Sequence, residues 1–183
     1  MALDPVRRSA ARTATLVAVP LAIAVAVISL LTFGGFGTDP PVPPGPAATG
    51  PVTMTAPALP PEVVPVCRQI VADLPETVAG HARRPVTAGP EQNAAFGDPP
   101  ITLACGAPAP TFPATDDVYT LSGVCWHAVP GGDTTAWTTV DRAVPVTVTV
   151  PGPSDGSGQS VLPFSEAVGP NDPRLETFPS GCI

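Results

Sequence analysis

The chain of 183 residues contains no lysine, and its eight basic residues are all arginine. Aromatic residues make up only 5% of the chain and histidine occupies two positions, whereas proline occupies 28. After residue 61, thirteen acidic residues outnumber five arginines, which gives that region a net charge of −8. A phosphate backbone repels an acidic surface that has no basic patch, so we expect no nucleic-acid partner.

The sequence also lacks the residue spacings that catalytic and metal sites need. His81 and His127 stand in no ligand spacing, and no C-x-x-C pair indicates zinc or redox chemistry. No G-x-S-x-G surrounds a serine, and Asp116-Asp117 lack the further acidic residues of a calcium loop. We therefore expect no metal, no cofactor and no catalytic residue. An active site made of scattered residues would leave no such motif and stays an alternative.

One long apolar stretch, residues 13–36, carries no charge. A helix needs about 20 such residues to cross a bilayer. Three arginines precede the stretch within residues 1–12, and no other follows until Arg68. We therefore predict a single-pass cell-membrane protein with its N-terminus in the cytoplasm and the C-terminal domain outside. A secreted protein, cut after a signal peptide near residues 46–48, is the alternative.

Residues 37–61 are rich in proline and nearly uncharged, with no helical or alternating periodicity. Such a segment favours an extended polyproline conformation, so we predict an extracytoplasmic linker here. It is either an ordinary tether or a stalk that reaches toward a wall layer or a partner.

The remaining residues, 62–183, are predicted to form one α+β domain in two layers. Apolar residues at three- and four-residue spacing indicate a helix from Val63 to Leu74, which Pro75 ends. A second, short helix is indicated over residues 161–168. We expect both helices to lie on one face of an antiparallel sheet.

Between these helices the apolar period changes to two. The clearest strand covers residues 143–151, where valine alternates with threonine or proline. Pro145 places this strand at a sheet edge, or turns its missing N–H outward. Other strands are indicated over residues 85–87, 101–105 and 134–140, and residues 119–129 indicate one strand or a pair of strands. Together they predict a meander of about four to five strands.

All four cysteines follow the predicted membrane span, and in an exported domain an even number indicates disulfides. Cys67 lies on the apolar face of the first helix and Cys105 on the apolar face of its strand, so we pair them. Cys125 and Cys182 pair by elimination. Zinc or redox sites are the alternatives, and both normally use closely spaced cysteines.

Several segments, in this order, resemble one family. They are Leu74-Pro75, Arg83-Arg84-Pro85, Gly97-Asp98-Pro99-Pro100-Ile101, Leu103-Ala104-Cys105-Gly106, Gly123-Val124-Cys125-Trp126 and Thr138-Thr139-Val140-Asp141-Arg142. The chain is similar to the actinobacterial domain-of-unknown-function family 3515, small proteins with an N-terminal membrane segment. Phe96 stands where this family usually has tryptophan, and Ala104 where it usually has arginine, so a partner contact through that arginine does not transfer. The resemblance implies an exported envelope protein and no known reaction.

We single out Arg83, Arg84, Asp98 and Trp126 as candidate interaction residues. The two arginines either bind an anion or form ion pairs in a solvated turn. The leading hypothesis is a non-enzymatic protein whose disulfide-bonded outer domain binds another cell-envelope component. The alternative is a small-molecule-binding or enzymatic envelope domain, which a deep pocket around His81, Arg83 or Asp98 would favour.

Overall fold

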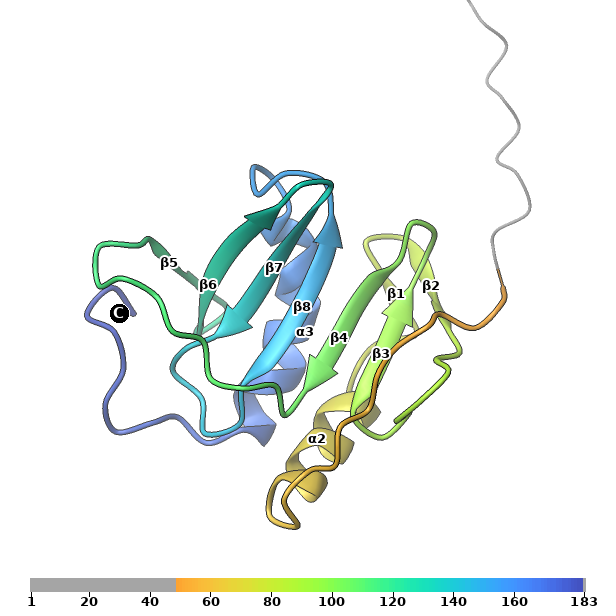
Figure 1. The fold of residues 1–183 in the computed structure, drawn as a ribbon, viewed down its shortest axis with the longest axis horizontal. Coiled ribbons are helices and arrows are strands. Elements are labelled where there is room, and N and C mark those ends of the chain that lie inside the picture. The colour runs from red at the N-terminus through yellow and green to blue at the C-terminus, as the bar shows by residue number, and fades with distance from the viewer. Residues whose placement is uncertain (1–48, 183) are drawn as a thin grey trace, which may run out of the picture. The chain divides into compact units, whose positions relative to one another are not determined.

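An eight-stranded antiparallel sheet organises residues 49–182, the part of the chain that the computed structural model describes (Figure 1). The strands are β1 (Thr77–Val78), β2 (His81–Arg84), β3 (Asn93–Phe96), β4 (Ile101–Cys105), β5 (Val118–Leu121), β6 (Val124–Gly131), β7 (Thr134–Thr139) and β8 (Val146–Pro151). Their order across the sheet is β1-β2-β3-β4-β8-β7-β6-β5. With helices α2 (Val63–Ala72) and α3 (Gly158–Asn171), this confirms the α+β prediction.

The predicted membrane span at residues 13–36 lies outside the described residues. Over residues 49–182, no helix has both the length and the apolar character needed to cross a bilayer.

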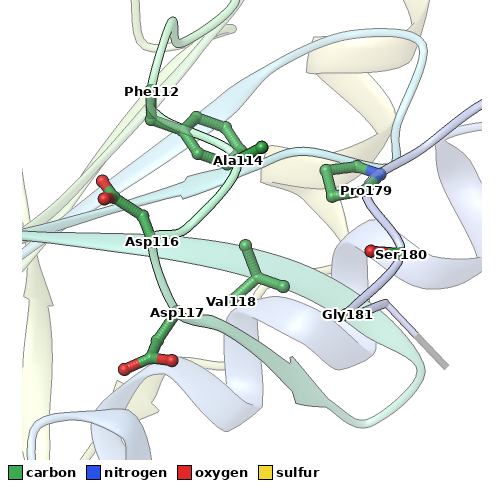
Figure 2. A pocket seen from close by; sticks show the side chains of 8 residues that line it. All are labelled: Phe112, Ala114, Asp116, Asp117, Val118, Pro179, Ser180 and Gly181. Carbon is green, nitrogen blue, oxygen red and sulfur yellow. The ribbon is translucent and has the colours of Figure 1, made fainter.

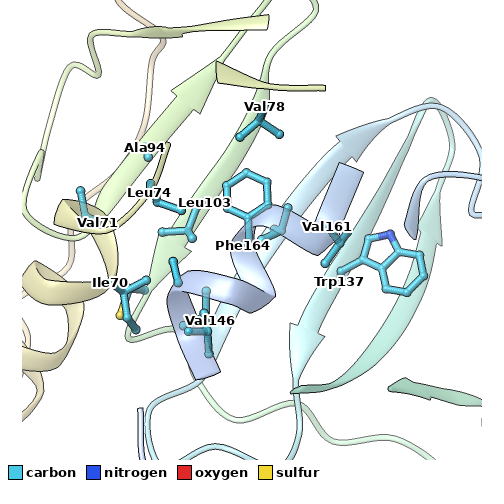
Figure 3. Packing of buried hydrophobic residues seen from close by; sticks show 14 of the residues in the cluster. Ile70, Val71, Leu74, Val78, Ala94, Leu103, Trp137, Val146, Val161 and Phe164 are labelled. Atoms are coloured by element: carbon cyan, nitrogen blue, oxygen red, sulfur yellow. The ribbon is translucent and has the colours of Figure 1, made fainter. Parts of the chain in front are cut away.

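Both helices pack on the same face of the sheet, and the hydrophobic core lies between the two layers (Figure 3). Phe96 of β3 and Phe164 of α3 meet edge to face, with ring centroids 5.8 Å apart. The indole N–H groups of Trp126 and Trp137 donate to the hydroxyls of Ser165 and Ser157. The core therefore buries both indoles without leaving their polar atoms unpaired.

The strand with the clearest alternation, β8, lies in the middle of the sheet between β4 and β7. Its valines point into the core, and Thr147 and Thr149 point to the opposite face. The prediction that Pro145 places this strand at an edge is wrong. Pro145 precedes β8, so its missing N–H interrupts no ladder, and its carbonyl accepts a hydrogen bond from the Gly106 N–H.

The predicted meander of four to five strands is also wrong, because β8 inserts between β4 and β7 and because three short strands were missed. The sequence of β3 does not alternate, since all four of its residues are buried. The strand expected at residues 85–87 makes only one isolated bridge, from Val86 to Val52. The regular strand there, β2, ends one residue earlier, at Arg84.

Residues 50–59, within the predicted linker, lie against the domain. The side-chain amide of Asn93 donates to the Thr55 carbonyl at 2.9 Å, and that of Gln92 donates to the Pro57 carbonyl at 3.2 Å. Leu59 packs against the hydrophobic core. This segment covers the outer face of β3, which explains why that strand is buried on both sides.

Both predicted disulfides are present, Cys67–Cys105 and Cys125–Cys182. The first joins α2 to β4 within the core, where both cysteines are almost completely buried. The second joins β6 to the C-terminal tail and closes a separation of 57 residues.

Candidate functional site

The elements at the β5 end of the sheet carry exposed apolar side chains. Four large hydrophobic residues of the described part are well exposed: Tyr119 at 44%, Val129 at 49%, Leu175 at 40% and Phe178 at 38%. They belong to β5, β6 and the C-terminal tail, which lie on the same side of the molecule in Figure 1. Exposed apolar surface that gathers on one side marks a candidate binding surface.

A hollow of about 470 Å³ opens at this end, between the loop that leads into β5 and the C-terminal tail (Figure 2). We call it the acidic hollow. Its lining residues are Phe112, Ala114, Asp116, Asp117, Val118, Pro179, Ser180 and Gly181. Two carboxylates and no basic side chain line it, so within the described residues it favours a cationic or amine-bearing group.

His127 of β6 holds the loop side of the acidic hollow in place. Its imidazole stacks on the Phe112 ring, with centroids 4.1 Å apart and planes inclined by 13°. The His127 Nε2 atom lies 3.1 Å from Asp116 Oδ2. His127 is buried, whereas the Asp116 side chain is 39% exposed, so the imidazole fixes a carboxylate that still meets solvent.

The tail side of the acidic hollow depends on a glycine and a disulfide. A Cβ atom on Gly181 would lie 2.6 Å from Val118 Cγ2, so only glycine lets the tail approach β5 this closely. The next residue, Cys182, is bonded to Cys125. Arg174 adds a hydrogen bond to the Cys182 carbonyl, and its guanidinium lies 3.9 Å above the Phe178 ring.

A buried charged cluster anchors the start of this tail. Asp141, fully buried, accepts a hydrogen bond from the Cys125 N–H and pairs with Arg142 at 3.4 Å and Arg174 at 3.3 Å. The Arg142 guanidinium also donates to the carbonyls of Gly123 and Asp172. The cluster thereby joins the β5–β6 turn, the strand connection before β8 and the tail.

Asp172, at the C-terminal end of α3, makes the stability of this region depend on pH. Burial raises its pKa from 3.8 to about 6, against the lowering effects of the Val144 N–H and the Arg142 charge. Between these pH values the folded chain binds more protons than the unfolded chain. The stability that this carboxyl contributes is therefore fully present below a pH of 3.8 and is lost as the pH rises through about 6.

We expect Asp172→Asn to flatten the pH dependence of unfolding between about pH 4 and pH 7. Asparagine keeps a side-chain oxygen that accepts from the Val144 N–H, as Asp172 Oδ1 does. Urea unfolding at several pH values measures the effect. An unchanged slope in the variant would show that another group carries the dependence.

A second hollow of about 310 Å³ lies on the helix-covered face of the same end, between β5 and the start of α3. We call it the aromatic hollow. Tyr119 and Trp137 meet there edge to face, with centroids 5.4 Å apart, and Leu121 and Leu162 complete its apolar wall. Ser154, Asp155 and Gln159 give it a polar rim. An apolar floor with a few polar groups suits an apolar or aromatic side chain.

A family model for proteins of unknown function, DUF3515, matches residues 15–176. The chain belongs to this family. Neither the curated proteins nor the solved structures that were compared include a match. Membership confirms the resemblance, and it assigns no activity to a DUF3515 protein, so a function has to be argued from the site itself.

In this DUF3515 protein the predicted interaction residues do not form one site. Arg83 donates to the Val71 carbonyl, and Arg84 donates to the Gly50 and Gly97 carbonyls, so both tie backbone segments together. Asp98 is exposed in the turn between β3 and β4, and three strands separate β4 from β5 in the sheet. Trp126 is fully buried and presents no surface to a partner.

Three hollows of the described DUF3515 domain, with volumes of about 470, 210 and 310 Å³, are not lined by His81, Arg83 or Asp98. The residues that do form the site include Asp116 and Asp117, which the sequence showed only as an isolated acidic pair. Tyr119, the single tyrosine of the chain, was placed in a strand without a role. In the sequence, this tyrosine follows two aspartates by only two residues, and that combination could have indicated an exposed binding strand.

Proposed function

We propose that this DUF3515 protein is a membrane-anchored envelope protein that binds another envelope component, without catalysis, at the β5 end of its outer domain. One observation carries the proposal: the acidic hollow and the aromatic hollow flank the same edge strand, β5. The opposite edge strand, β1, has only two residues. This difference between the two edges supports a binding surface at the β5 end of the sheet.

Export of the domain is supported by its cysteines. All four pair in the structure, and structural disulfides persist in oxidising compartments outside the cytoplasm. The uncharged residues 13–36 and the arginines before them support an anchor with the N-terminus in the cytoplasm.

The surroundings of the two ring nitrogens of His127 support a binding role rather than acid–base catalysis. Its Nε2 atom already contacts Asp116, and its Nδ1 atom is buried with no hydrogen-bond partner among the described residues. Asp116 occupies Nε2, and Nδ1 is buried away from a molecule in the acidic hollow. Over residues 49–182, no group of three or more acidic, histidine or cysteine side chains is placed to hold a metal ion.

A small-molecule ligand is the second candidate. The acidic hollow has a volume of about 470 Å³, within the range of roughly 300–1,000 Å³ that is common for ligand pockets. An amine-bearing molecule matches its two carboxylates. A macromolecular partner accounts better for the exposed apolar side chains on β5, β6 and the C-terminal tail.

The test is site-specific photo-crosslinking of the full-length protein in intact cells. A photoreactive amino acid replaces Thr120 on β5 in one variant and Thr77 on β1 in the matched control, since both threonines are exposed on edge strands. We expect one reproducible adduct from position 120 and none from position 77. We also expect Asp116→Asn with Asp117→Asn to weaken that adduct, because the carboxylates supply the charge of the site.

Equal crosslinking from both edges would mean that the β5 end has no special role. The absence of any macromolecular adduct at position 120, with retained binding of a small amine, would favour the small-molecule candidate.

A further inference from the structure

Within residues 49–182, strand β5 leaves backbone hydrogen-bonding groups unpaired along its outer side. Among the described strands it pairs only with β6, through a two-residue turn at Ser122 and Gly123. Thr120 lies opposite Cys125, whose N–H donates to Asp141 and whose carbonyl accepts from Val140. Both groups of Cys125 thus point away from β5. In an antiparallel ladder the opposite residue does the same, so the N–H and carbonyl of Thr120 point outward.

The two hollows lie on opposite faces of this free edge. Val118 is paired with His127 and lines the acidic hollow, on the face that the helices leave open. Tyr119 and Leu121 are paired with Trp126 and Val124, and both line the aromatic hollow on the helix-covered face. Side chains of a strand alternate between faces, so a strand added to β5 would place successive side chains in alternate hollows.

We propose that β5 binds an extended segment of a partner protein as a ninth strand, and that this segment carries a basic residue flanked by apolar residues. This inference rests on the proposed function and specifies its partner. Main-chain hydrogen bonds to Thr120 hold the segment, a basic side chain lies near Asp116 and Asp117, and its apolar neighbours contact Tyr119 and Leu121.

Charge selects this occupant over a second copy of the same chain. The region after residue 61 has a net charge of −8, and the entry to β5 carries two adjacent aspartates. Pairing two β5 edges would bring these acidic segments together, and like charges disfavour such an interface. A basic segment from another protein would instead be attracted to these aspartates.

The experiment measures binding of a fluorescent synthetic peptide that alternates valine and arginine to the full-length chain in nonionic detergent. Thr120→Pro removes the outward N–H and leaves the ladder to β6 intact, since proline is tolerated on edge strands. We expect it to weaken binding by at least about tenfold. The matched variant Thr120→Val keeps the N–H and should bind within about twofold of the unsubstituted chain.

Two further measurements keep the test decisive. Tyr119→Ser removes an aromatic wall without touching the backbone and should also weaken binding. A peptide with glutamate in place of arginine should not bind, and added salt should weaken the arginine peptide. Thermal unfolding of each variant shows whether it is folded.

Undiminished binding by a folded Thr120→Pro variant would overturn strand addition, and so would a failure of the unsubstituted chain to bind the arginine peptide saturably. If the crosslink from position 120 persists in cells despite either result, the binding site stands and only the strand mode is wrong. If the peptide binds as expected while no cellular adduct forms, the strand mode stands and the envelope partner is wrong.

Discussion

Replacing Asp141 by alanine is expected to lower the free energy of unfolding by about 3–5 kcal/mol, a large part of the stability of a domain this size. The Asp141 carboxylate is fully buried and lies between Arg142 at 3.4 Å and Arg174 at 3.3 Å. The Arg142 side chain is only 7% exposed. Removal of Asp141 therefore leaves a buried guanidinium without its counter-charge, and also leaves the Cys125 N–H without its acceptor.

Urea unfolding of the full-length chain measures this effect, and two variants separate its causes. Asp141→Asn keeps an oxygen that accepts from Cys125 but removes the charge, so it should fall between the unsubstituted chain and the alanine variant. Asp133→Ala removes an exposed carboxylate from the β6–β7 turn and should change stability by less than about 0.5 kcal/mol. If Asp141→Ala and Asp133→Ala lose equally little stability, the buried cluster does not hold the tail.

The parts of the fold that the sequence predicted are those in which one face is buried and the other is open. Strand β8 alternates valine and threonine because the helices cover one face and leave the other partly exposed. Helix α2 shows its apolar spacing for the same reason, with Cys67, Ile70 and Val71 buried. The pairing of Cys67 with Cys105 followed directly, since both lie on inward faces.

The parts that escaped prediction depend on contacts between distant segments. Strand β3 does not alternate, because residues 50–59 bury its second face from more than thirty residues away in the chain. Arg83 and Arg84 were read as exposed charges, yet their guanidinium groups bind backbone carbonyls of other segments. No local pattern reports such partners.

The acidic hollow could not be predicted from the sequence either, because about sixty residues separate its two walls in the chain. Asp116 and Asp117 gain a role only when the tail lies against Val118, and the tail lies there because Cys182 is bonded to Cys125. The bridge itself was predictable by elimination, once Cys67 was paired with Cys105, but its consequence for the surface was not. The position of the tail also depends on the buried Asp141 cluster, and no sequence motif predicts this cluster.

Removing the two disulfides one at a time should therefore distinguish effects on stability from effects on binding. Each closes a loop, with sequence separations of 38 and 57, so in the chain-entropy model each contributes about 4 kcal/mol. We expect Cys67→Ala with Cys105→Ala to lose at least that amount, because both sulfurs lie in the core and their removal also leaves a void. Urea unfolding under non-reducing conditions provides the measurement.

Cys125→Ala with Cys182→Ala is the matched comparison, since it removes a bridge of similar entropic value that joins β6 to the C-terminal tail. It frees one wall of the acidic hollow while leaving the contact between α2 and β4 intact. Under conditions where both double variants are still folded, this one should lose the adduct from position 120, whereas the core variant should keep it. The reverse result would place the binding surface on the core side of the domain and remove the acidic hollow from the proposed function.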